Sequence, residues 1–173
     1  MYIDDKDSAL AYPRLTRTIM LITGIALGFI ISGFFIMPFF ATDNSMLPNI
    51  KIGNLVFILK HVSPEIGDIV LIKSPADAEG VYLKRLIAKE GDAIEIRNKV
   101  IYINNKRFRF KWKTQSIDER IFPMNFTYRD NTPSVKIKKN NFYVIGDNLD
   151  RSYDSRNFGV IPYERIIGKV IYQ

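Results

Sequence analysis

The chain has 173 residues, with 25 Lys and Arg, 18 Asp and Glu, one His and no Cys, and its formal net charge is +7. This length fits one compact domain with an appendage and leaves no room for two large domains. The absence of cysteine excludes a disulfide scaffold, a cysteine nucleophile and a thiolate metal site, and the single His61 cannot supply a multi-histidine zinc site. Hydrolytic chemistry would have to come from Ser, Lys, Asp or Glu, and we expect no cofactor and no metal.

The N-terminal part contains an apolar stretch without any charged residue between Arg17 and Asp43. About 20 apolar residues suffice to cross a bilayer. A buried core helix would show a polar face, and a cleaved secretory signal would have a shorter apolar core with a small-x-small exit. We therefore predict a tail over residues 1–17, a retained transmembrane anchor over residues 18–42 and an outer domain over residues 43–173.

The charges in front of the predicted anchor indicate its orientation. Arg14 and Arg17 immediately precede the apolar stretch. Because positively charged flanks stay on the cytoplasmic side, the N-terminus is expected in the cytoplasm and the larger C-terminal part on the outer face. The sequence thus predicts a single-pass membrane protein that contacts the lipid bilayer.

Beyond Asp43 the pattern changes to short β-branched and aromatic runs, separated by Gly, Pro, Asn and Asp. Such runs are typical of many short strands joined by turns. One of them is expected to form a hairpin that turns at Asn98 and Lys99, whereas the polar residues 114–134 are expected to form a long connection. The fold class predicted is mostly β, a compact β-rich domain behind a single N-terminal transmembrane helix. The apolar face of the hairpin would consist of Ile94, Ile96, Ile101 and Ile103. Strands are predicted within residues 54–60, 67–73, 80–90, 92–108, 134–147 and 165–173.

Basic and aromatic residues alternate in the segment KRFRFKWK, residues 106–113. The simplest interpretation is a strand with a buried aromatic face, made of Phe108, Phe110 and Trp112, and a solvated basic face. Contact with a membrane and stacking on nucleic acid are the alternatives. Because the anchor would place this domain outside the cell interior, we expect no nucleic acid partner.

A serine nucleophile in a chain with one histidine needs another base, and lysine serves in Ser-Lys variants of the catalytic triad. The lysine must be neutral, which requires burial that lowers its pKa. Ser45, in the turn-like segment TDNSMLPNI, and Lys84, in the apolar run GVYLKRLIA, meet these demands. Taken alone, Ser45 would usually be an ordinary turn serine, and Lys84 would usually be a solvent-facing strand lysine.

Four segments in this order resemble the bacterial type I signal peptidases, which are membrane-bound Ser-Lys endopeptidases. They are SMLPNI from Ser45, GDIVLIKSP from Gly67, YLKRLIAKEGD from Tyr82 and GDNLDRSYDSRNFG from Gly146. The resemblance implies that Ser45 is the nucleophile and Lys84 the general base. It further implies that Ser152 orients the lysine amine, and that Asp154 and Arg156 brace the loop that carries this serine.

The resemblance also implies a substrate and a location. The substrates would be the signal peptides of exported preproteins, cut after small residues at Ala-x-Ala sites, and the enzyme would be a monomer in the bacterial cytoplasmic membrane. The substrate would lie extended beside residues 41–45 and 81–84, as an added strand. Residues expected to line its shallow apolar pockets are Met46, Ile50, Leu71, Tyr82 and Leu83.

Two positions depart from the family pattern. Asp43 stands two residues before the nucleophile, where relatives often carry a hydroxyl that helps to bind the oxyanion, and Leu149 replaces an arginine. We expect Asp43 to turn outward into water and leave the Ser45 backbone N–H as the principal oxyanion donor; the alternative is a protonated Asp43 that donates a hydrogen bond. Leu149 is expected to affect only loop packing.

Other functions remain open at this point. The chain could be a catalytically silent, membrane-anchored relative that only holds peptides, or a specialised conjugation or pilin-type peptidase. A self-cleaving repressor uses the same pair of residues but needs a DNA-binding helical domain where this chain has its apolar stretch. The acidic and basic residues from Asp147 to Arg156 could also form an ordinary solvated turn.

Overall fold

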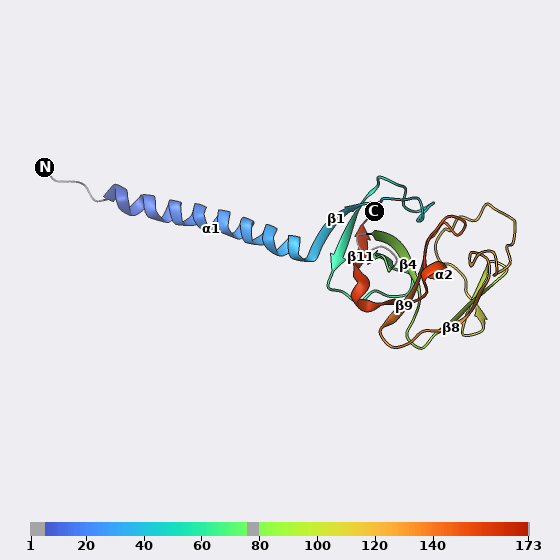
Figure 1. The fold of residues 1–173 in the computed structure, drawn as a ribbon. Helices are drawn as coiled ribbons and strands as arrows, with labels where there is room; N and C mark the ends of the chain where they lie inside the picture. Colours follow the sequence, from blue (N-terminus) through green and yellow to red (C-terminus); the bar gives the residue numbers. More distant parts are fainter. Residues whose placement is uncertain (1–5, 76–79, 173) are drawn as a thin grey trace. The chain divides into compact units, whose positions relative to one another are not determined.

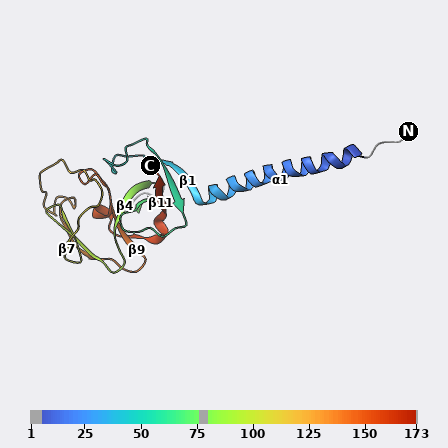
Figure 2. The ribbon, with the colours of Figure 1, turned by 180° about the vertical axis from the view of Figure 1, so that it is seen from behind.

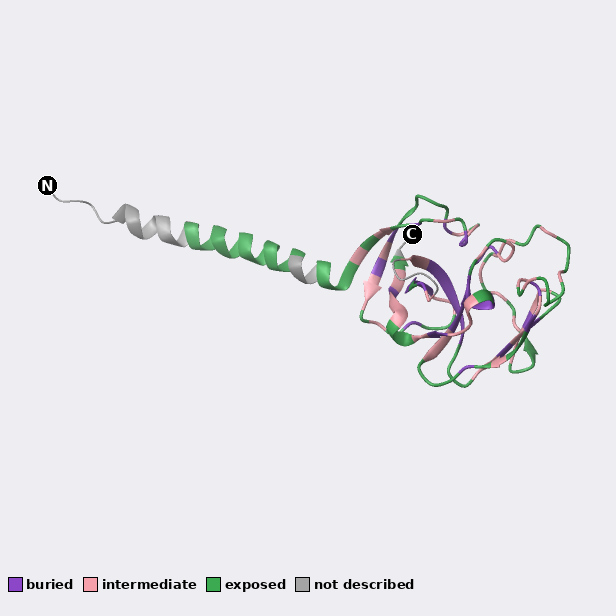
Figure 3. Cartoon of the chain, viewed as in Figure 1, coloured by how far each residue is buried: buried purple, intermediate pink, exposed green. Residues whose placement is uncertain are grey.

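The computed structural model describes residues 6–75 and 80–172, and the chain divides into two compact units after Ile36. The first unit is helix α1 (Lys6–Phe35). Its segment Leu15–Phe35 is long and apolar enough to cross a membrane, and the described side chains along it are exposed (Figure 3). A helix with apolar side chains all round is expected in a lipid environment.

The helix has other bounds than the predicted anchor, residues 18–42, and the anchor range itself stays a prediction. Helix α1 begins at Lys6 and ends at Phe35, and strand β1 (Ile36–Phe40) follows directly. Pro38 gives the physical reason, since proline cannot continue a helix and disfavours helical geometry in the residue before it. β1 is an edge strand of the larger sheet, which is where a strand tolerates proline.

The second unit is built on a seven-stranded sheet (Figure 1). Its strand order is β1-β2-β11-β3-β4-β9-β10, and the ladders from β2 to β10 are antiparallel. The strands after β1 are β2 (Leu55–Lys60), β11 (Ile166–Tyr172), β3 (Ile69–Lys73), β4 (Val81–Lys89), β9 (Asn141–Ile145) and β10 (Ile161–Pro162).

A four-stranded sheet of order β7-β6-β5-β8 forms the other part of this unit. Seen from behind, β7 lies at the opposite end of the unit from β1 and β11 (Figure 2). The predicted hairpin is confirmed, because Arg97 pairs with Val100 and both turn residues between them have positive φ angles. Three of its four predicted apolar residues are buried and Ile103 is half-buried. The strands are β7 (Lys106–Arg107), β6 (Val100–Ile103), β5 (Ala93–Arg97) and β8 (Thr132–Lys136).

The strand predicted over residues 106–113 is wrong beyond Arg107, although its aromatic face is partly buried against a hydrophobic cluster as expected. The ring centroids of Phe108 and Trp112 lie 6.0 Å apart. Four residues of extended chain would separate them by about 13 Å. The chain therefore bends to bring Phe108, Phe110 and Trp112 into mutual contact, and this contact replaces the regular alternation of a strand.

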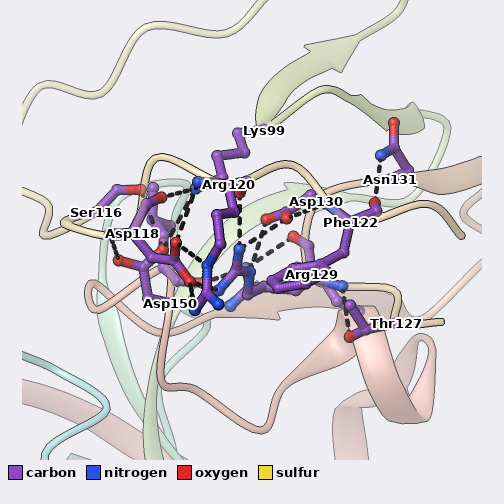
Figure 4. Close-up of polar contacts among 12 residues, drawn as sticks. Lys99, Ser116, Asp118, Arg120, Phe122, Thr127, Arg129, Asp130, Asn131 and Asp150 are labelled. Atoms are coloured by element: carbon purple, nitrogen blue, oxygen red, sulfur yellow. Dashed lines mark hydrogen bonds and ion pairs between the residues drawn. The ribbon is translucent and has the colours of Figure 1, made fainter.

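The predicted long connection has a defined structure without regular strands up to β8, and polar contacts hold it (Figure 4). Arg129 binds Asp130 and Asp118, and Asp118 also binds Arg120. The acid Asp150, from the loop after β9, accepts hydrogen bonds from the backbone N–H groups of residues 117 and 118. The connection is thereby fastened to the loop that carries the last sequence motif.

Strand β4 lies at the centre of the hydrophobic interior, where six consecutive residues, from Leu83 to Ala88, are buried. Its neighbours β3 and β9 are also largely buried. Successive side chains of a strand point to opposite faces of the sheet. Lys84 and Arg85 are therefore buried on opposite faces, and each needs its own means of tolerating the lost hydration.

Candidate active site

Ser45 lies in a tight turn that follows β1 and is 3% exposed. The backbone N–H of Ile50 donates to the carbonyl of Met46, which closes the turn. The Ser45 carbonyl accepts a hydrogen bond of 2.9 Å from the Asn148 N–H, so the turn is tied to the loop after β9. A Cβ atom at Gly146 would lie 2.5 Å from this carbonyl oxygen. The approach of loop and turn thus requires glycine at that position.

Lys84 brings its amine to the serine hydroxyl. β4 pairs with β3 through Lys84 and Val70, and the lysine is 1% exposed. Its Nζ donates a 2.6 Å hydrogen bond to Ser45 Oγ. Burial lowers the pKa of Lys84, although the nearby Asp43 carboxylate acts in the opposite direction. A buried amine with a lowered pKa, in direct contact with a hydroxyl, can accept the hydroxyl proton.

Asp43 does not turn outward into water, so that expectation is wrong. Its Oδ1 accepts a 2.9 Å hydrogen bond from the backbone N–H of Ser45, and its Oδ2 lies 3.8 Å from Lys84 Nζ. Two favourable partners outweigh full hydration of the carboxylate, which remains 41% exposed. The sequence did not indicate this arrangement, because both partners depend on how the turn faces β4.

Arg85 and Asp147 form a buried ion pair that sequence reasoning missed. Arg85 Nε donates to Asp147 Oδ1 at 2.7 Å and Nη2 to Oδ2 at 2.5 Å. Asn49 from the serine turn donates a 2.6 Å hydrogen bond to the same carboxylate. The ring centroid of Trp112 lies 4.5 Å from the guanidinium carbon of Arg85. The signal available in the sequence was a second cation directly after Lys84, since adjacent residues of a doubly buried strand cannot both reach water.

Asp154 and Arg156 form a buried ion pair at the start of the short helix α2 (Ser155–Phe158), where the loop after β9 ends. Arg156 Nε and Nη2 donate to the two oxygens of Asp154 at 2.9 and 2.8 Å. Asp154 also accepts from the Gly146 N–H, and Arg156 donates to the Leu149 carbonyl. Burial by itself would raise the pKa of Asp154, but the guanidinium and these hydrogen bonds hold it below its usual value. Leu149 is itself half-buried against a hydrophobic cluster.

Ser152 lies in the loop between β9 and α2. A Cβ atom on Gly146 would be 2.3 Å from Ser152 Oγ, so the hydroxyl packs directly over this glycine. Its buried Oγ makes no hydrogen bond of regular geometry within the described parts of the chain, residues 6–75 and 80–172. The predicted bond between this hydroxyl and the Lys84 amine is thus not formed here, and the orienting role of Ser152 stays a prediction.

The five residues predicted to line substrate pockets differ in burial. Met46, Ile50, Leu71 and Leu83 belong to one buried hydrophobic cluster. Tyr82 is half-buried, and its ring centroid lies 5.2 Å from Lys84 Nζ. Their contact with a substrate stays a prediction.

Comparison with known proteins identifies the family. The model of the family "Signal peptidase, peptidase S26" matches residues 14–173. The chain belongs to the signal peptidase family, peptidase S26. It is 36% identical over 155 residues to signal peptidase I of Bacillus amyloliquefaciens, which covers 86% of this chain and 78% of the relative. The identity to signal peptidase IB of Staphylococcus aureus is 31% over 156 residues, or 84% and 81% of the two chains.

A solved structure is also similar. The crystal structure of a signal peptidase I from Enterococcus faecalis V583 covers 62% of this chain and 97% of its own chain, with 24% sequence identity and a TM-score of 0.48. Family membership makes the chain a hydrolase, a serine endopeptidase of the signal peptidase I type. Ser45, Lys84 and the Asp154–Arg156 pair all fall within the matched residues.

The buried pair in this peptidase generates a prediction on stability. Asp154→Asn should lower the free energy of unfolding by about 3–5 kcal/mol, because it leaves the Arg156 guanidinium buried without a counter-charge. Denaturant unfolding of the detergent-solubilised protein measures this loss. Glu95→Gln, which removes one partner of an exposed ion pair with Arg97, is the control and should change little.

The same pair should make stability depend on pH. Because the pKa of Asp154 is lowered on folding, its stabilisation is complete above the unfolded value of about 3.9 and is lost as the pH falls below that value. The difference between wild type and Asp154→Asn should therefore shrink in acid. An equal difference at pH 7 and at pH 3 would contradict the ion-pair explanation.

Proposed function

We propose that this chain is a signal peptidase I that cleaves the signal peptides of exported preproteins with a Ser45–Lys84 dyad, after small residues at Ala-x-Ala sites. The observation that carries the proposal is the 2.6 Å contact between the buried Lys84 amine and Ser45 Oγ. The buried setting supports the base role, since only a neutral amine can take a proton.

In the proposed mechanism, neutral Lys84 accepts the Ser45 hydroxyl proton while Oγ forms a bond to the scissile carbonyl carbon. The carbonyl electron pair moves to oxygen and gives a tetrahedral oxyanion. Collapse of this intermediate breaks the C–N bond, and the Lys84 ammonium donates its proton to the departing amine. Lys84 then accepts a proton from water while the water oxygen forms a bond to the acyl carbon. Collapse of this second intermediate breaks the C–Oγ bond, the Lys84 ammonium returns the proton to Ser45 Oγ, and the signal peptide departs with a free carboxylate.

The supporting residues have positioning roles in this proposal. Ser152 would hydrogen-bond to the lysine amine and orient it. Asp154 and Arg156 hold that loop through Gly146 and Leu149, so they fix where the hydroxyl of Ser152 lies. None of these three side chains forms a covalent bond in the proposed mechanism.

The substrate is proposed to add as a strand beside residues 41–45 and 81–84, where main-chain hydrogen bonds give affinity. Shallow pockets over the apolar residues would admit alanine and exclude larger side chains. The lining residues would be Met46, Ile50, Leu71, Tyr82 and Leu83. The same apolar lining would keep water from Lys84, so specificity and base activation would share one cause.

The apolar helix supports a membrane location. We propose that Leu15–Phe35 crosses the bacterial cytoplasmic membrane once, with the N-terminus in the cytoplasm and the catalytic unit on the outer face. A signal peptide also crosses this bilayer, so enzyme and substrate would meet by diffusion in two dimensions.

Ser45→Ala tests the nucleophile. Detergent-solubilised wild type should cleave a preprotein bearing an Ala-x-Ala site after the second Ala, and the variant should lose activity by many orders of magnitude. Its unfolding midpoint should stay close to that of wild type. A preprotein with Trp in place of the second Ala is the matched substrate control and should not be cut. Activity of Ser45→Ala above a few per cent of wild type would rule out the assignment.

Lys84→Arg tests the base. Arginine keeps a positive charge at any usable pH, so this variant should be as inactive as Lys84→Ala. In wild type the rate should rise with pH through the lowered pKa of Lys84, below the usual value of about 10.4, because activity needs the neutral amine. A rate that falls as the pH rises from 5 to 8 would contradict this mechanism.

Protease accessibility tests the topology. A protease added outside intact spheroplasts should digest the chain beyond Asp43 and spare residues 1–17, because the membrane shields the cytoplasmic tail. Immunoblots with tags at each end distinguish the fragments. Protection of the C-terminal tag until the membrane is lysed would reverse the proposed orientation.

A further inference from the structure

One carboxylate touches both members of the dyad. Asp43 Oδ1 accepts the Ser45 backbone N–H at 2.9 Å, while Oδ2 lies 3.8 Å from the amine of Lys84. The side chain remains 41% exposed. The position of Asp43 in the sequence does not dictate these two contacts, and both involve groups that the proposed reaction uses.

The contact with the backbone N–H conflicts with acyl transfer. A serine endopeptidase must stabilise the oxyanion with preorganised donors, and the backbone N–H of the nucleophile is one such donor. In the structure this N–H of Ser45 already donates to Asp43. A carboxylate and an oxyanion repel each other and cannot share the donor, so the carboxylate has to leave before the tetrahedral intermediate forms.

We propose that Asp43 is a latch that closes the oxyanion site of the free enzyme and is displaced by the scissile carbonyl of the substrate, which removes the nearest counter-charge from Lys84 at the same time. This latch rests on the proposed function. It makes Asp43 a positioning residue and takes no part in any covalent step, since no bond to Asp43 forms or breaks.

The charges around Lys84 favour a movable Asp43. Burial lowers the pKa of Lys84, Asp43 and Asp154 raise it, and Arg156 lowers it. Asp154 and Arg156 are both buried and bind each other, so their opposing effects stay fixed. Arg85 lies on the next position of β4 and has Asp147 as its partner. Among the described groups that act on the amine, Asp43 therefore combines opposite charge with access to water.

Displacement of the latch couples substrate binding to base activation. When the Asp43 carboxylate moves into water, the amine of Lys84 loses attraction for its proton, and its pKa falls further. Removing an opposite charge from within about 4–6 Å changes a pKa by about 1–3 units. In the free enzyme more of the lysine stays protonated, so the nucleophile is less reactive toward water and unselected peptides.

The pH dependence of the two kinetic constants tests the latch. The profile of kcat/KM reports the free enzyme, and that of kcat reports the bound complex. In wild type the rising limb of kcat should lie at least about one pH unit below that of kcat/KM. Coincident limbs would overturn the latch, because they would mean that Lys84 has the same surroundings with and without substrate.

Two variants separate the two contacts. Asp43→Asn keeps an oxygen that can accept the Ser45 N–H but removes the charge, so its kcat/KM limb should move to lower pH, onto the limb of kcat. Asp43→Ala also frees the N–H and should raise kcat/KM at high pH by up to roughly tenfold, the effect of one hydrogen bond. Glu65→Gln, at an exposed acid of the same unit, should match wild type. A hundredfold loss in both Asp43 variants would overturn the latch.

A measurement without turnover keeps the latch testable on its own. NMR titration of ¹⁵N-lysine-labelled protein follows the Lys84 amine directly, and Lys84→Gln identifies its resonance. The pKa of Lys84 should be lower in Asp43→Asn than in wild type, and an equal pKa would overturn the latch whatever the activity. If the pKa shifts but wild type cuts no preprotein, the electrostatic contact stands while the proposed substrate is wrong.

Discussion

The second unit depends on the exclusion of water from one amine, that of Lys84. Lys84 is 1% exposed on a strand whose neighbours are apolar on both sides. Burying an ammonium without a close counter-charge costs several kcal/mol, and a lysine avoids part of that cost by releasing its proton. The sheet that stabilises the fold therefore also creates the setting that the proposed base needs, because Lys84 is buried within it.

The neighbouring cations show the other way to bury a charge. Arginine cannot release its proton at usable pH, so Arg85 and Arg156 each have a buried carboxylate of their own, Asp147 and Asp154, in two-point contact. Both pairs hold the loop after β9, because Asp147 accepts a hydrogen bond from Asn49 of the serine turn and Asp154 accepts one from the Gly146 N–H. The loop then fixes the Ser45 carbonyl, so the permanent charges set the geometry in which the titratable one works.

Much of the fold could be predicted from the sequence, because its signals are local. The strands follow from β-branched runs between turn residues, and the hairpin at Asn98 and Lys99 follows from a two-residue turn between apolar alternations. The helix was expected to continue past Phe35 because the sequence stays apolar there. It ends at Phe35 because Pro38 disfavours helical geometry in the preceding residue. Hydropathy alone cannot distinguish the end of a span from an apolar edge strand.

The candidate site was harder to predict from the sequence, because its contacts join residues far apart in the chain. The motifs indicated Ser45 and Lys84, but the partner of Arg85 lies 62 residues away and could not be inferred from spacing. The interpretation of Asp43 failed for a related reason, since an acid next to an apolar span was assumed to prefer water over a backbone N–H.

Exposure decides which of the carboxylates near Ser45 and Lys84 can move in the way that the proposed latch requires. Asp147 and Asp154 are fully buried, and moving either would leave a guanidinium without a counter-charge in the interior. Asp43 has water within reach and leaves behind only a lysine that can shed its proton. A site that must be rigid for positioning and yet change its electrostatics on binding is best built in this way, with the fixed charges paired inside and the movable one at the rim.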